Sequence, residues 1–151
     1  VWYVRQGGDF VLYRVTPTVG TFNFAVSPNS KGGVFGGLPK VRWVIGYLDP
    51  KNYIEFEIDK QSFASAEYRN GKKTDHTKKK PHGIESSSFV IQMAVDPGRV
   101  LVQIRSGDKW EPLDQWNESG RNFGEGSFGF RLPNQDQMYL TDFTFTQPAA
   151  R

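Results

Sequence analysis

The sequence predicts an all-β protein, an antiparallel β-sandwich formed as a single domain by residues 1–151. Its composition mixes strand formers with turn formers, since aromatic residues make up 15% of the chain and 16 Gly and 9 Pro punctuate it. Short runs with a period of two are separated by turn signals at the spacing typical of a sandwich. No run of helical period exceeds two turns, so we expect about ten or eleven strands.

The clearest strands are 41–49 and 52–59, which flank the turn Asp49-Pro50-Lys51-Asn52. Because alternate side chains of a strand point to opposite faces, the second strand has one apolar and one polar face. The expected core side chains of this pair are Val41, Trp43, Ile45, Tyr47, Ile54, Phe56 and Ile58. The polar face of the second strand carries Tyr53, Glu55, Glu57 and Asp59.

Turn signals also separate the remaining predicted strands. Asn70-Gly71 and Asp96-Pro97-Gly98 are strong turn signals, 27–40 is a Gly/Pro-rich binding loop or long crossover, and 114–125 is expected to hold a short helical turn. The other expected strands are 2–5, 9–15, 21–26, 61–69, 89–95, 100–105, 109–113, 127–132 and 138–146.

Two sets of side chains compete for the core in the last strand, Tyr139 with Thr141 and Met138 with Leu140. A β-bulge near Thr141-Asp142 would let Met138 and Leu140 share a face with the two phenylalanines that follow, Phe143 and Phe145.

The net charge is +3, and most of the excess lies between Gly71 and Gly83, which enclose five lysines and two histidines. We interpret this segment as a solvated loop, with a contact for an anionic polymer as the alternative. It contains no aromatic residue on which bases could stack, so no nucleic-acid partner is expected. The absence of cysteine excludes disulfides and thiolate metal sites.

No apolar run approaches the roughly 18 residues of a membrane span. The first residue is Val, in a strand-like segment, so we expect a domain excised from a longer protein. The oligomeric state has no signature in the sequence.

Three stretches together resemble the concanavalin A-like lectin/glucanase superfamily, the jelly-roll sandwich of laminin-G-like modules. They are RWVIGYLDPKNYIEFEID, VDPGRVLVQI with SGDKWEPL, and GEGSFGFRLPNQDQMYLTDFTF. Within the superfamily the chain most resembles bacterial domains described as 3-keto-disaccharide hydrolase-like. The resemblance implies a jelly roll and a carbohydrate partner, in one module of an exported bacterial protein that is extracellular or periplasmic.

The row Glu55, Glu57 and Asp59 offers the chemistry of a glycoside hydrolase, which needs two carboxyl groups about 5–5.5 Å apart in the retaining mechanism. Glucanases of the superfamily carry Glu-x-Asp-x-Glu on one strand, so the resemblance would make Glu55 the nucleophile. This chain departs from that pattern at the second and third positions. The alternatives are a solvent-facing strand and a face that contacts sugar without catalysis.

Exposed Tyr and Trp side chains stack on sugar rings, and Tyr53, Trp110 and Trp116 are the candidates, whereas Trp43 is expected in the core. His76 and His82 lack a third ligand, so no transition-metal site is expected. The sequence leaves a structural calcium open, with ligands from Asp9, Asp49, Asp142 or Glu125, although no motif fixes one.

The sequence therefore favours a non-catalytic carbohydrate-binding module. Its concave face would present Tyr53, Glu55, Glu57, Arg105 and Trp110. The alternatives are a glucanase-type hydrolase and a structural or protein-interaction module without a sugar site.

Overall fold

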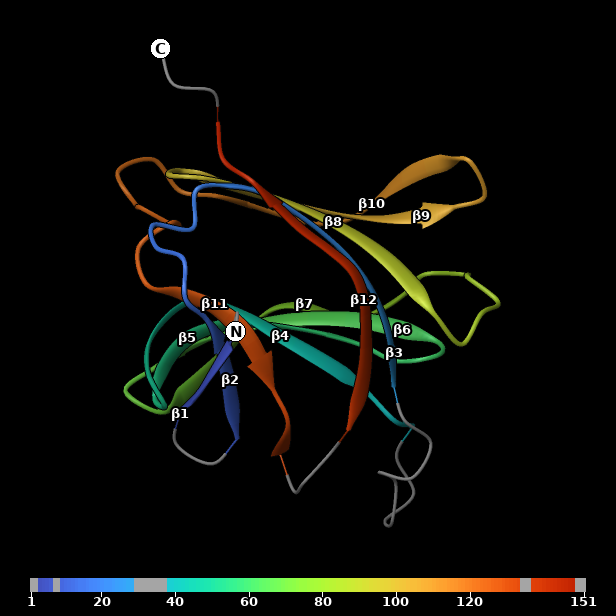
Figure 1. Cartoon of the computed structure of the whole chain (residues 1–151), viewed down its shortest axis with the longest axis horizontal. Coiled ribbons are helices and arrows are strands. Elements are labelled where there is room, and N and C mark those ends of the chain that lie inside the picture. Colours follow the sequence, from blue (N-terminus) through green and yellow to red (C-terminus); the bar gives the residue numbers. More distant parts are fainter. Residues whose placement is uncertain (1–2, 7–8, 29–37, 134–136, 149–151) are drawn as a thin grey trace.

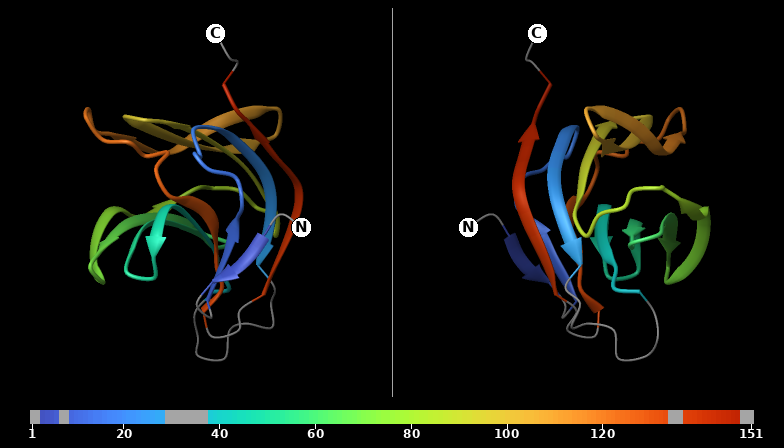
Figure 2. Two further views of the ribbon diagram at one scale, coloured as in Figure 1. Left: turned by 60° about the vertical axis from the view of Figure 1, so that its left-hand side comes forward. Right: turned by 90° about the vertical axis from the view of Figure 1, so that its right-hand side faces the viewer.

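The computed structural model describes residues 3–6, 9–28, 38–133 and 137–148, with the side chains of 3–6 left aside. Within these residues the chain forms twelve strands in two antiparallel sheets that face each other as layers (Figures 1 and 2). The predicted turn at 7–8, most of the loop 27–40 and part of the turn at 133–136 lie outside the described residues.

The larger sheet has seven strands and the smaller has five. In spatial order the larger sheet consists of β1 (Tyr3–Gln6), β2 (Phe10–Tyr13), β11 (Ser127–Arg131), β4 (Val41–Asp49), β5 (Asn52–Ile58), β6 (Ser62–Arg69) and β7 (Lys72–Pro81). The smaller consists of β10 (Lys109–Asn117), β9 (Arg99–Ser106), β8 (Phe89–Asp96), β3 (Gly20–Pro28) and β12 (Met138–Thr146). The all-β sandwich prediction is confirmed.

The core lies between the layers and is rich in aromatic rings. Phe22 of β3 stacks between Phe128 of β11 and Phe145 of β12, with ring centroids 4.3 Å apart in both pairs. Trp43 is fully buried, as predicted. Burial of such rings is the main favourable term in holding the two sheets together.

Several local predictions are confirmed. Strands β4 and β5 flank the turn in which Asp49 Oδ1 accepts the amide hydrogen of Lys51, with 2.7 Å between oxygen and nitrogen. Asn70 and Gly71 have φ of 53° and 80°, as the tight turn between β6 and β7 requires. In β12 the register shifts between Thr141 and Thr144, and Met138 and Leu140 pack against the core with Phe145.

The register of β4 corrects one core assignment. The pairing of β4 with β5 is interrupted between Ile45 and Asp49, where Gly46 has a φ of 61°. This irregularity turns Tyr47 to the outer face, where it packs against Tyr53 instead of joining Trp43 in the core.

The basic segment 71–83 is mainly a strand and not the solvated loop that we expected. Strand β7 pairs with β6 along its length and forms one edge of the larger sheet. Its lysines are mostly exposed, an arrangement that protects an edge strand from pairing with another chain.

A buried carboxylate explains why this edge strand is held in place. Asp114 of β10 accepts hydrogen bonds from Ser65 Oγ at 2.6 Å, Thr77 Oγ1 at 2.8 Å and Trp116 Nε1 at 2.9 Å. The His76 ring of β7 stacks on Trp116, with 3.8 Å between ring centroids. These contacts join the two sheets at one margin.

The same contacts correct the expectation for 114–125. Residues up to Asn117 belong to β10, and no helical turn forms in the rest of that segment. In the part of the chain that the structure describes, no helix is long and apolar enough to cross a membrane.

Candidate functional site

The outer face of the seven-stranded sheet carries a cluster of rings that is separate from the core. Its buried members are Phe10, Leu12, Val44, Tyr47 and Tyr53, with Tyr68 packed against them. Tyr53 of β5 and Tyr68 of β6 are cross-strand partners, and their rings stack with centroids 4.7 Å apart. Because Tyr53 is only 7% exposed and its ring stacks on Tyr68, Tyr68 is the more accessible ring of the pair.

Charged side chains lie beside the tyrosines on the same face. Glu55 is only 5% exposed and receives two hydrogen bonds from Arg131, from Nε at 2.8 Å and from Nη2 at 3.2 Å. Arg42 lies between two carboxylates, with its Nε 3.6 Å from Glu55 Oε1 and 3.5 Å from Glu57 Oε2. Lys40 Nζ lies 3.4 Å from Glu57 Oε1.

A shallow hollow adjoins these carboxylates because β6 carries small side chains where it crosses this face. It lies between β5 and β7 and is lined by Glu55, Glu57, Ala64, Ser65, Ala66, Lys73 and Asp75. Lys73 Nζ is 3.7 Å from Asp75 Oδ1, so the far wall of the hollow is also an ion pair. We call this outer face, with its tyrosines, ion pairs and hollow, the charged face.

The protonation of the charged face follows from burial and from pairing. Burial raises the pKa of Tyr53 to about 12 and also raises the pKa of Tyr68, so both hydroxyls are neutral hydrogen-bond donors near neutral pH. Burial alone would lower the pKa of Arg131, but its hydrogen bonds and attraction to Glu55 outweigh that effect and raise it. The guanidinium therefore stays charged beside the carboxylate.

The structure brings together three of the predicted site residues, Tyr53, Glu55 and Glu57. Asp59 does not join the row, because β5 ends at Ile58. Its Oδ1 accepts the amide hydrogens of Gln61 and Ser62, both at 2.8 Å, and so shapes the turn into β6. The prediction that three carboxylates project from one strand face is wrong for Asp59.

The other predicted residues lie elsewhere. Arg105 and Trp110 are cross-strand partners in the five-stranded sheet, with the guanidinium carbon 5.8 Å from the ring centroid. They cannot share a face with Tyr53, because β9 and β10 belong to the other sheet. Trp116 is 5% exposed and lies in the core, so its expected exposure is wrong, and the same holds for Tyr53, which is 7% exposed.

The sequence interpretation missed Arg42, Arg131 and Tyr68 as members of this face. Part of the signal was present for Arg131, which alternates with the core residues Phe128 and Phe130, whereas Arg42 and Tyr68 share their strand faces with Val44 and Ala66. What the alternation lacks is the order of the strands, which places β11 beside β4 and so brings Arg131 to Glu55.

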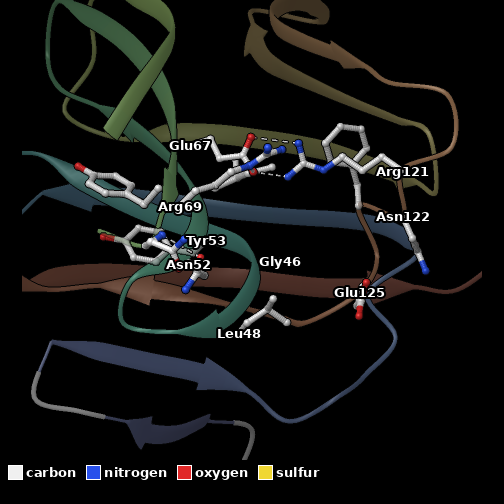
Figure 3. Close-up of a pocket in the computed structure, with 13 residues that line it drawn as sticks. Gly46, Leu48, Asn52, Tyr53, Glu67, Arg69, Arg121, Asn122 and Glu125 are labelled. Atoms are coloured by element: carbon white, nitrogen blue, oxygen red, sulfur yellow. Dashed lines mark hydrogen bonds and ion pairs between the residues drawn. The ribbon is translucent and has the colours of Figure 1, made fainter. Parts of the chain in front are cut away.

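A second hollow, the end pocket, opens where the β4–β5 and β6–β7 turns meet segment 118–126 (Figure 3). Its volume is about 300 Å³. It is lined by Gly46, Leu48, Asn52, Tyr53, Ile54, Glu67, Tyr68, Arg69, Asn70, Arg121, Asn122, Phe123 and Glu125. Figure 3 shows Glu67 and Arg121 facing each other across paired hydrogen bonds.

The described residues contain no group of three or more His, Cys, Asp or Glu side chains that could hold a metal ion. Asp49 already bonds to Lys51 and Asn52 within its turn, and Glu125 lines the end pocket. The structural calcium, for which Asp9 and Asp142 were further candidates, stays a prediction.

Comparisons with known proteins support the fold. The sequence matches no protein-family profile and no curated protein. The structure is similar to the carbohydrate binding module CBM66 from Bacillus subtilis, with a TM-score of 0.66, 16% identity, and coverage of 93% of this chain and 83% of that one. It is also similar to sheep galectin-11 in complex with glycerol, with a TM-score of 0.63, 12% identity, and coverage of 94% and 100%.

A functionally unknown protein from Saccharomyces cerevisiae is similar as well, with a TM-score of 0.54, 15% identity, and coverage of 93% and 76%. At these identities the likeness concerns the fold alone, and it confirms the predicted jelly-roll sandwich. The narrower resemblance to 3-keto-disaccharide hydrolase-like domains stays a prediction.

Proposed function

We propose that this chain is a carbohydrate-binding module that holds a glycan on the charged face. The observation that carries the proposal is the placement of the Glu55–Arg131–Arg42 cluster beside the stacked pair Tyr53 and Tyr68. Sugar hydroxyls both donate and accept, so carboxylates and guanidinium groups held in fixed orientation bind them well. The apolar face of a sugar ring packs on an aromatic side chain, and Tyr68 would supply it here because Tyr53 is buried beneath its neighbours.

The energetics of the cluster agree with a binding role. Removing charges from water costs several kcal/mol per ion, and their mutual attraction often only compensates that cost. A sheet face that served stability alone has no need of a buried glutamate between two arginines. The names of two structural neighbours point the same way, since one is a carbohydrate-binding module and the other a galectin with bound glycerol.

The hydrolase alternative has less support from the geometry. Of the three carboxylates that would have formed its acidic row, Glu55 is engaged by Arg131 and Asp59 by backbone amides. Binding without catalysis therefore accounts for more of what surrounds these groups.

A glycan screen followed by calorimetric titration tests the proposal. Glu57 borders the hollow and is only partly buried, so Glu57→Gln is expected to fold normally and to weaken binding of the best glycan about tenfold. The matched control is Glu111→Gln, an exposed glutamate of β10, which should leave the affinity unchanged. The proposal fails if no glycan binds, or if both variants bind as the parent chain does.

A further inference from the structure

The end pocket adjoins the charged face, with which it shares Tyr53 and Tyr68, but it opens at the β4–β5 and β6–β7 turns. Figure 3 shows Asn52 and Arg69 arriving from strand ends on one side and Arg121 and Glu125 from the loop opposite. The ring of Tyr53 points away from Arg121 and Glu125, toward the charged face. With about 300 Å³, the pocket is at the lower end of the range for small-molecule sites, roughly 300–1,000 Å³.

Its walls are fixed by hydrogen bonds before any ligand arrives. The backbone amide of Asn70 donates to Asn52 Oδ1 at 3.0 Å, and the amide of Gly71 donates to the carbonyl of Lys51 at 3.0 Å. These two hydrogen bonds connect the β4–β5 turn to the β6–β7 turn. A preformed pocket loses little conformational entropy when it binds, which favours even a small ligand.

The ion pair at the back of the pocket is equally constrained. Arg121 Nη1 donates to Glu67 Oε1 at 3.0 Å and to Glu118 Oε2 at 2.9 Å, and Nη2 donates to Glu67 Oε2. Arg69 Nε donates to the same Glu67 oxygen at 3.1 Å. Because the guanidinium of Arg121 is occupied by carboxylates on two sides, it offers little positive charge to an anion.

The chemistry of the lining points to a neutral, polyhydroxylated ligand. The charges balance, since Arg69 and Arg121 oppose Glu67 and Glu125. The amides of Asn70 and Asn122 add groups that can both donate and accept.

The lining also has an apolar part, in which Leu48 is exposed whereas Ile54 and Phe123 are buried core residues. Leu48 is 63% exposed at the rim, so its side chain offers apolar surface beside these polar groups. One saturated ring with hydroxyls on its edge and C–H groups on its face matches this combination.

We propose that the end pocket is a second binding site, next to the charged face across the shared residues Tyr53 and Tyr68, for a single neutral sugar ring. Hydroxyls would bond to Glu125 and the asparagine amides while the ring face rests on Leu48. The domain would then hold two saccharide units at once, one on each site, and could link two chains or two parts of one branched chain. This bivalency rests on the proposed function, whereas the pocket itself does not.

A titration followed by ¹⁵N–¹H NMR tests this site. The probes are methyl glycosides of glucose, galactose, mannose, xylose and N-acetylglucosamine, added singly to the intact chain. At least one is expected to shift the amide signals of Asn70, Asn122 and Glu125. Leu48→Arg, which places bulk and charge at the rim, should weaken that binding at least about tenfold.

Two control variants separate this site from the charged face. Leu38 is also exposed but does not line the pocket, so Leu38→Arg should bind as the parent chain does. Glu57→Gln should likewise leave the end-pocket shifts unchanged, even if it abolishes binding on the charged face. The proposal is overturned if no probe shifts the three amides, or if Leu48→Arg does not weaken the binding that shifts them.

Discussion

The two outer faces of the sandwich are built from the same kind of alternating strand, yet they differ in charge. The charged face places Glu55 and Glu57 among arginines and beside the hollow. The corresponding row across the five-stranded sheet is uncharged and consists of Asn23, Gln92 and Gln103, paired in register. We call this second outer face the amide face.

The amide face shows which side chains are sufficient for a solvent-exposed sheet face. Gln92 Nε2 donates to Asn23 Oδ1 at 3.1 Å, and the positions around this pair are small or uncharged, including Thr21, Ala25 and Ala94. Neutral amides and short side chains are sufficient in the middle of this face, and its Arg105 lies against Trp110 near the β9–β10 turn. Neither solubility nor folding therefore requires the buried ion pairs of the charged face. This difference between the two faces is the main physical argument that the charged face binds a ligand.

The largest expected effect comes from breaking the buried ion pair. Arg131→Ala leaves Glu55 buried with Arg42 alone, so it should lower the free energy of unfolding by about 3 kcal/mol. Urea denaturation measures this change. Arg105→Ala, on an exposed arginine of the other sheet, should change it by less than about 0.5 kcal/mol. Equal losses in both variants would mean that the two faces do not differ as described.

A large side chain placed in the hollow should weaken glycan binding without lowering the stability of the fold. Ala64 points outward on β6 and lines the hollow, so Ala64→Phe should weaken glycan binding at least about tenfold. Ala94→Phe is the matched change on the amide face and should leave the affinity as it was. Titration calorimetry on both variants measures the affinities, and retained binding by Ala64→Phe would place the glycan elsewhere.

A smaller effect is expected from the titration of Tyr53. Its pKa in the folded chain is raised from 10.0 to about 12 by burial, so the neutral hydroxyl contributes stability that is fully present below pH 10. That contribution is lost as the pH rises from 10 to about 12. Tyr53→Phe should therefore flatten the fall in unfolding free energy across this window, whereas Tyr139→Phe, at a 63% exposed position, should not. Identical slopes in both variants would argue against a buried Tyr53 hydroxyl.

The smallest effect is expected for a tryptophan that the sequence favoured. Trp110 packs against Arg105 on the five-stranded sheet, away from the charged face. Trp110→Ala should therefore leave glycan affinity unchanged in the same titration. A marked loss of affinity would restore Trp110 as a stacking platform and move the site to the amide face.

Local chemistry allowed much of this architecture to be predicted from the sequence. The turn at Asp49, the bulge near Thr141 and the shared face of Tyr53, Glu55 and Glu57 follow from side chains within a few residues of one another. Turn propensity and a period of two carry that information.

Contacts between distant segments could not be predicted in the same way. Arg131 and Glu55 are 76 residues apart and meet only because β11 inserts between β2 and β4. Segment 72–81 shows no alternation of apolar and polar residues. It forms a strand because it pairs with β6 and because Thr77 donates a hydrogen bond to Asp114. Strand order and these long-range contacts decide which polar residues share a face, and periodicity does not encode them.

The most direct test of the central claim is a map of amide chemical shifts across both outer faces as the best glycan is added. The account predicts shifts in β5, β6 and β7, at Glu55, Ala64, Ala66 and Lys73, with the amides of Asn23, Gln92 and Gln103 unmoved. Shifts confined to the amide face, or an absence of shifts around the hollow, would contradict it.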